Sequence, residues 1–145
     1  MLKAVLAVVA GYLTMAIAVA MLSLGLFLLL GPDRAFQPGT YEVTSTWLVV
    51  MIVFSLVAAI AGGWVCAAIA KGKGAVWALV VLVLILGGLN TIPVVTASKA
   101  PPAVRTGDVP NLEAMMNGKE PVWFALLLPF IGVAGVMIGG RSKRS

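Results

Sequence analysis

The fold is decided by one stretch of small residues, which reads Ala58-Ala59-Ile60-Ala61-Gly62-Gly63-Trp64-Val65-Cys66-Ala67-Ala68-Ile69-Ala70. Small residues recur at every fourth position in two adjacent rows. One row is Ser55, Ala59, Gly63 and Ala67, and the other is Ala58, Gly62, Cys66 and Ala70. On an α-helix the two rows merge into one smooth face. Such a face lets a second helix approach closely in lipid, where packing rather than the hydrophobic effect joins helices.

This stretch lies in a chain that is far more apolar than a soluble domain. Of its 145 residues, 61% are hydrophobic and 10% are charged, and the mean hydropathy is +1.10. A soluble domain is about half apolar and about a quarter charged. We therefore predict an integral membrane protein with a single domain over residues 1–145.

Four segments without a charged residue are each long enough to cross a bilayer as a helix, which takes about 20 residues. Gly31-Pro32, the Lys71–Gly74 turn, Pro93 and Pro121 mark their ends. We predict an all-α membrane protein, a four-transmembrane-helix bundle, with helices at about 3–30, 44–70, 74–92 and 121–140. The loops are then 31–43 and 93–120. Pro129 predicts a kink in the fourth helix.

The first segment has two interpretations. Ala16-Ile17-Ala18 and Ala18-Val19-Ala20 have the small-x-small pattern of a signal-peptide cleavage site. However, the apolar run continues through Leu30, which is longer than an ordinary signal-peptide core. We expect an uncleaved membrane anchor.

The charges are distributed unequally between the two ends of the predicted bundle. One end carries six of the ten basic residues and no acidic residue: Lys3, Lys71, Lys73, Arg141, Lys143 and Arg144. The other end carries all five acidic residues and the remaining four basic ones. By the positive-inside rule, we predict a multi-pass protein of the inner (plasma) membrane with both termini in the cytoplasm.

The fourth segment also has a face of small residues. We predict that the second and fourth helices pack together in the cytoplasmic half of the membrane. The residues assigned to this contact are Ala59, Gly62, Gly63, Cys66, Gly132, Gly135 and Gly139. A contact between two copies of the chain is the competing use of the same face. Because the first segment is bulky in its outer half, the bundle is expected to be tighter at its cytoplasmic end.

The residue inventory excludes much chemistry. The chain has no histidine and only one cysteine, Cys66, so a Ser-His-Asp triad, a histidine-ligated metal and a disulfide cannot be built. No charged residue lies within a span, which argues against an ion-coupled carrier. We predict that the protein is not an enzyme and holds no cofactor and no metal.

Polar residues gather near the outer ends of two predicted helices. The candidate ligand pocket consists of Glu42, Ser45, Thr46, Asn90 and Thr91. Alternatively, Glu42 complements the positive N-terminus of the second helix, and Thr44 or Ser45 acts as its N-cap. Residues 108–118 predict a short helix, either on the bilayer surface or as a lid.

The four tryptophans receive two assignments. Trp47, Trp77 and Trp123 lie near the ends of predicted helices, where aromatic residues anchor a protein at the membrane interface. Trp64 lies deeper and opposite the small face, so we expect it to face lipid or a neighbouring chain.

The four-helix pattern, with Ala61-Gly62-Gly63-Trp64-Val65-Cys66 and the closing Gly135-Val136-Met137-Ile138-Gly139-Gly140-Arg141, resembles small uncharacterised bacterial inner-membrane proteins rich in Ala, Gly and Val. This resemblance is architectural and implies no activity. Small multidrug exporters also have four helices, but they use an acidic residue in the first helix. This chain has none there, so their function is not carried over.

Three functional hypotheses follow. The first is a structural or accessory subunit, or a self-associating scaffold, that partners with the lipid bilayer, with other copies or with a larger membrane complex. The second is a small-molecule or lipid binding or transport protein with an outward-facing pocket near Glu42, Asn90 and Thr91. The third is a holin-like pore former. No nucleic-acid binding is expected, because a basic tail beside a membrane span is an ordinary topology and anionic-lipid signal.

Overall fold

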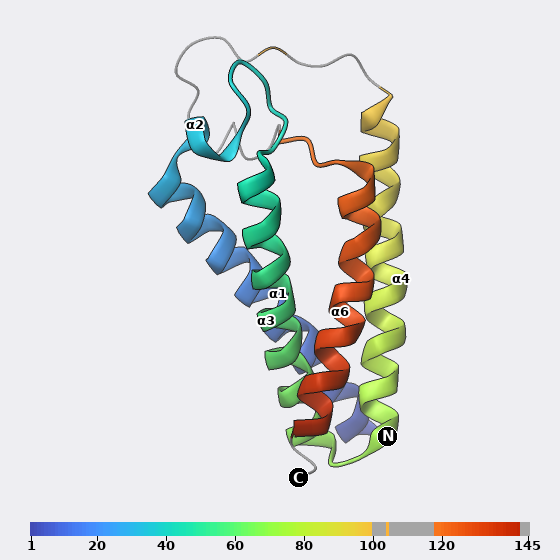
Figure 1. The fold of residues 1–145 in the computed structure, drawn as a ribbon. Coiled ribbons are helices and arrows are strands. Elements are labelled where there is room, and N and C mark those ends of the chain that lie inside the picture. The colour runs from blue at the N-terminus through green and yellow to red at the C-terminus, as the bar shows by residue number, and fades with distance from the viewer. Residues whose placement is uncertain (100–103, 105–117, 143–145) are drawn as a thin grey trace.

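The computed structural model describes residues 1–99, 104 and 118–142, and these form an all-helical bundle (Figure 1). Its long helices are α1 (Leu2–Leu30), α3 (Ser45–Ala70), α4 (Lys73–Ser98) and α6 (Val122–Ser142), and α2 (Pro32–Ala35) is a single turn. Each of the four long helices is long and apolar enough to cross a membrane. The described chain is therefore a multi-pass helical membrane protein. The segment predicted as a helix over 108–118 lies, apart from Gly118, outside the described residues.

One predicted boundary is wrong. We expected the third helix to end at Pro93, but α4 continues to Ser98 with Pro93 inside it. Proline removes only its own N–H from the helix, and the remaining backbone bonds still form when the apolar sequence continues, as it does here. Near the end of α4, the hydroxyl of Thr96 donates to the Ile92 carbonyl at 2.9 Å. The second loop therefore begins about six residues later than predicted.

The helices are not packed equally tightly. α3 makes its largest contacts with α6 and α1, and α4 packs mainly on α6. Contacts of α4 with α1 and with α3 are much smaller. Figure 1 shows all four helices close together at the end where both termini lie, whereas α1 diverges from α4 toward the opposite end. The bundle is thus closed at one end and opens along the side between α1 and α4.

Two core clusters reflect this difference. The cluster near the termini is built from small and aliphatic residues, among them Ala59, Cys66, Leu79 and Val136. The cluster at the opposite end is aromatic: the Phe27 ring makes edge-on contacts with Phe36 and with Trp47, at centroid distances of 5.9 and 5.8 Å. Small side chains let helices approach closely in the first cluster, whereas in the second the aromatic rings join α1 to α3 and to the loop between them.

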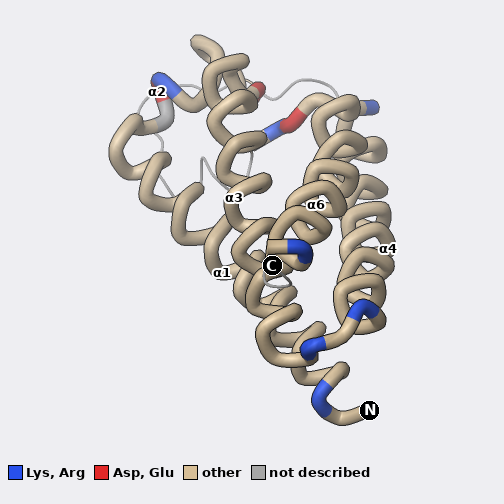
Figure 2. Tube along the Cα trace, turned by 60° about the horizontal axis from the view of Figure 1, so that its bottom comes forward, with Lys and Arg blue, Asp and Glu red and all other residues tan. Residues whose placement is uncertain are grey.

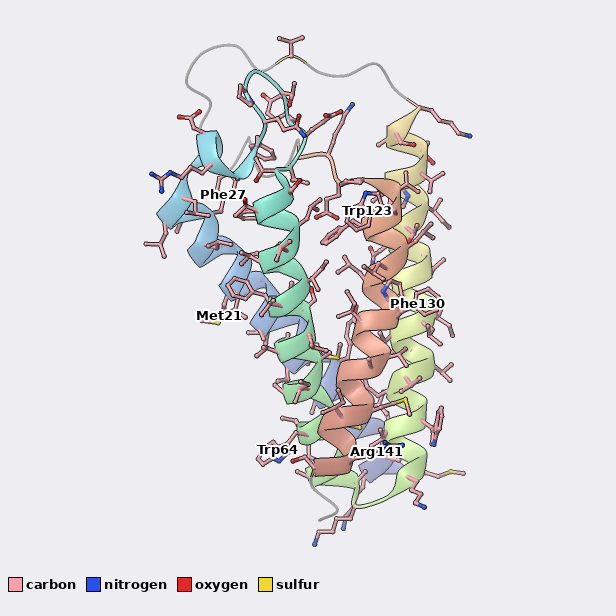
Figure 3. All side chains as sticks on the ribbon, viewed as in Figure 1. Met21, Phe27, Trp64, Trp123, Phe130 and Arg141 are labelled. Carbon is pink, nitrogen blue, oxygen red and sulfur yellow. The ribbon has the colours of Figure 1, made fainter. Side chains whose placement is uncertain are left out.

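Trp47 is therefore not the interfacial anchor that its position predicted, because it is buried in this aromatic cluster. Its burial follows from the loop between α1 and α3, which folds back over the helix ends. Trp64 and Trp123 remain exposed on the helix surfaces, as does Phe130 (Figure 3).

Three glycines lie where α3 and α6 approach each other. A Cβ atom added at Gly63 would meet the backbone oxygen of Val136, and one added at Gly139 would meet the backbone oxygen of Ile60. A Cβ atom at Gly135 would meet the side chain of Ala59. Two other glycines differ from the prediction. Gly62 faces Gly11 and Met15 of α1, and Gly132 faces Val83 of α4.

The approach at Gly63 predicts an unusual response to alanine. In an open helical position, glycine to alanine adds up to about 1 kcal/mol of stability. We expect Gly63→Ala to lower the free energy of unfolding instead, by about 1–3 kcal/mol, because the methyl group displaces the Val136 backbone. The matched control is Gly88→Ala, since Gly88 has no atom within 4 Å of an added Cβ. Unfolding in dodecyl sulfate mixed micelles, followed by circular dichroism, measures both; equal responses would contradict the close approach.

Candidate ligand cavity

The predicted polar residues at the outer end separate into different roles. Thr44 is the N-cap of α3: its hydroxyl oxygen accepts a hydrogen bond from the Trp47 backbone N–H at 3.3 Å. This confirms the capping role that we offered for Thr44 or Ser45. Ser45 and Thr46 are exposed on the first turn of α3 and do not line the cavities described below. Glu42 is also exposed and lies in the preceding loop.

A cavity of about 400 Å³ lies between the four long helices, and we term it the main cavity because residues of all four helices line it. Most of its lining is apolar, including Met15 and Val19 of α1 and Leu128 of α6. Two small residues of α1, Ala16 and Ala20, line it and are exposed, so the cavity is open on that side. This volume falls in the range of small-molecule sites, roughly 300–1,000 Å³.

The polar side chains in the interior of the spans fall into two groups. The hydroxyls of Thr14, Ser23 and Thr91 each donate to a carbonyl one turn earlier, at 2.7, 2.6 and 3.0 Å. In contrast, Tyr12, Ser55 and Asn90 make no side-chain hydrogen bond among the described residues, and all three line the cavity. An unpartnered polar group is costly in hydrocarbon. The cavity therefore presents three polar side chains that have no protein partner among the described residues and are open to water or a ligand.

Thr91 has a structural task. Pro129 lacks an N–H, so it leaves the carbonyl of Ala125, four residues earlier, without its helical partner. The Thr91 hydroxyl lies 3.2 Å from this carbonyl oxygen and 3.0 Å from that of Gly87, so its one proton is shared between the two acceptors. A Cβ added at Gly87 would meet the Pro129 ring at 2.7 Å. α4 thus accommodates the proline of α6 and satisfies the group that it frees. The kink expected at Pro129 stays a prediction, and α6 continues through it as one helix.

The position of Glu120 is set by backbone pairing in the loops. Residues 41–43 run beside Lys119: the Lys119 N–H donates to the Tyr41 carbonyl at 2.8 Å, and the Val43 N–H donates to the Lys119 carbonyl at 3.2 Å. Pro121 follows directly, and its carbonyl accepts from the Phe124 N–H as α6 begins. The pairing holds residue 119 above the bundle, so the next residue is placed at the outer end of the cavity.

Glu120 is the charged residue of this cavity. Among the described residues that line it, no other carries a charge. Glu120 also lines two neighbouring cavities of about 340 and 250 Å³, and the larger of these is shared with Glu42 and Lys119. Burial raises the pKa of the Glu120 carboxyl because it disfavours the charged form. Its carboxylate makes no ion pair with another described residue.

Of the five residues predicted to form a pocket, the structure brings only Asn90 and Thr91 into the same cavity. Asn90 and Thr91 line the cavity together, with Asn90 free to meet a ligand. Glu42 instead belongs to the neighbouring outer cavity. The sequence does not mark Glu120 as a residue of the cavity, because nothing in its spacing distinguishes it from the other acidic residues. The available signal was its position directly before Pro121, where a span begins.

Comparison of the chain with protein-family models, with curated proteins and with solved structures found no match. The site is therefore interpreted from its own geometry.

The hydrogen bond from Thr91 can be tested with a double-mutant cycle. We expect Thr91→Val to lower the free energy of unfolding by about 1 kcal/mol, because the Ala125 carbonyl loses its donor. In a Pro129→Ala background the restored N–H satisfies this carbonyl, so the cost of Thr91→Val should be smaller. Thr96→Val is the control, since Thr96 bonds only within its own helix. A cost of Thr91→Val that is identical in both backgrounds would show that the two residues are not coupled.

Proposed function

We propose that this protein is a non-enzymatic, multi-pass inner-membrane protein that binds an amphipathic small molecule or lipid in the cavity between its helices. The cavity and its three unbonded polar side chains, Tyr12, Ser55 and Asn90, carry the proposal. A mostly apolar pocket with a few convergent polar groups is the usual form of a small-molecule site. The polar groups would orient a ligand whose apolar part contacts the surrounding helices.

The composition of the cavity supports binding rather than catalysis. The chain contains no histidine, and its one cysteine is buried in the core cluster near the termini. Among the described residues that line the cavity between the four helices, Glu120 is the one carboxylate, and no amine accompanies it; Glu42 and Lys119 line the adjoining cavity.

The cavity can be tested by filling it. We expect Ala20→Phe to reduce binding of a neutral probe, dodecanol, about tenfold, because the ring occupies cavity space, and tenfold corresponds to about 1.4 kcal/mol. Ala134→Phe is the matched control, since Ala134 is exposed on α6 and lines none of the cavities described here. Native mass spectrometry from mild detergent counts bound dodecanol. Absence of binding to the wild type, or equal binding by Ala20→Phe, would favour the structural or scaffold role.

We also propose that both termini are cytoplasmic and that the cavity lies toward the external side. The support is the charge distribution: the end with the termini carries Lys3, Lys71, Lys73 and Arg141, and Figure 2 shows basic but no acidic residues there. The described acidic residues lie at the other end, Asp33 on α2 and Glu42 and Glu120 on the loops. This is the arrangement that the positive-inside rule assigns to a cytoplasmic end.

Cysteine accessibility tests this orientation. In a Cys66→Ala background, Ser142→Cys should react with a membrane-impermeant maleimide only after the cells are broken, because Ser142 ends α6 beside the basic residues. Gln37→Cys, on the exposed loop at the other end, should react in intact cells. The reverse pattern would invert the proposed topology.

Finally, we propose that glycine-mediated packing of α3 on α6 is what keeps the cytoplasmic half closed. Its support is that Gly63, Gly135 and Gly139 each lie against the other helix with no room for a Cβ atom. With that end closed, α1 diverges from α4 toward the other end and leaves space for a ligand (Figure 1).

A further inference from the structure

Glu120 lines three adjoining cavities at the outer end of the bundle. It lies where the main cavity meets the two neighbouring cavities, directly before α6 begins. Below it, the lining of the main cavity extends along α6 as far as Gly132. From Val122 to Gly132 is ten residues, which corresponds to about 15 Å of helix. A single carboxylate thus stands at the outer end of a deep and mostly apolar space.

We propose that the ligand is a cationic amphiphile, an alkyl chain that bears an ammonium group, and that the Glu120 carboxylate is its counter-charge. This inference rests on the proposed function and specifies the chemical class of the ligand. The alkyl chain would lie against the apolar side chains of α1, α4 and α6. The ammonium group would lie at the outer end, beside Glu120 and within the reach of the loops.

Charge complementarity supports a cation. The carboxylate has no ion-pair partner among the described residues, and its partial burial disfavours the charged form unless a cation lies beside it. Lys119 is adjacent in sequence, but it lines the neighbouring outer cavity and not the main one, and it has an interaction of its own. An anionic ligand would add a second negative charge at this point, and a neutral one would leave the carboxylate unpaired.

The apolar lining argues against a simple metal ion. No group of three or more metal-ligating side chains lies together among the described residues. A hydrated ion would also leave the wall formed by Met15, Val19 and Leu128 in contact with water. A ligand that is both cationic and apolar satisfies the carboxylate and the wall together.

The dependence of binding on pH has a definite sign. Because the pKa of Glu120 is raised by burial, its ionised fraction increases as the pH rises through a range above that of an ordinary glutamate. Binding of a ligand with a fixed positive charge should therefore strengthen as the pH rises through that range. The other titratable groups that line these cavities are Glu42 and Lys119, on the loops, and Tyr12 of α1, which packs on the core cluster near the termini, at the far end of the cavity from Glu120; α3 and α4 contribute none to the described lining.

The test compares head groups on one chain length. Native mass spectrometry in mild detergent measures binding of dodecyltrimethylammonium, dodecanol and dodecanoate to the wild type, to Glu120→Gln and to Glu42→Gln. Glu42→Gln is the matched control, because it removes the same charge from the adjoining cavity. We expect the wild type to prefer the cation over dodecanol about tenfold, and increasingly so at higher pH. Glu120→Gln should lose this preference and its pH dependence but still bind dodecanol, and Glu120→Asp should restore part of the preference.

The outcomes separate this inference from the proposed function. Binding of dodecanol without any preference for the cation, or an equal loss in Glu42→Gln and Glu120→Gln, would overturn the cationic ligand and leave the cavity as a binding site. Failure of every probe to bind would overturn both. Phosphatidylethanolamine is added as a further arm: its retention in a Glu120-dependent manner would support the inference and identify a membrane lipid as the source of the ammonium group.

Discussion

The constraint on which this structure depends is that hydrocarbon offers a polar group no partner, so the protein must supply one. Within the spans, the hydroxyls of Thr14 and Ser23 satisfy this constraint by donating hydrogen bonds to carbonyls of their own helix. The Thr91 hydroxyl of α4 donates to the Ala125 carbonyl of α6, which Pro129 leaves without its helical partner. The same constraint makes Tyr12, Ser55 and Asn90 informative, because they line one cavity and have no protein partner among the described residues.

The cavity exists because the two halves of the bundle are packed with different side chains. Near the termini the core cluster consists of small and aliphatic residues, and a Cβ atom added at Gly63 or Gly139 would meet the backbone of the facing helix. Toward the other end, the rings of Phe27, Phe36 and Trp47 fill the contact between α1, α3 and the loop, and α1 leaves α4 (Figure 1). Because packing is the main force that joins helices in lipid, a change in side-chain size along the bundle becomes a change in helix separation.

The loops complete the site by a different interaction. Backbone pairing between residues 41–43 and Lys119 brings two distant parts of the chain together above the bundle. This pairing places Glu120 at the outer end of the cavity, whereas the charged residues of the long helices, Lys3, Lys73 and Arg141, all lie at the end with the termini. A protein of this composition can therefore present one carboxylate to an apolar space without the cost of burying it at the centre of the membrane.

The sequence by itself determined the elements: four apolar segments predicted four helices, and Thr44 was recognisable as a candidate N-cap. Local composition and hydrogen bonding decide these features. The sequence did not determine where α4 ends, because the effect of Pro93 depends on whether the helix continues favourably beyond it. Only the tertiary structure decided that Trp47 is buried and that Gly62 faces α1. It also decided that Asn90 and Glu120 line the same cavity, whereas Glu42 lines a neighbouring one. These features depend on which helix faces which and on pairing between distant loops, and neither is encoded in the periodicity of a single segment.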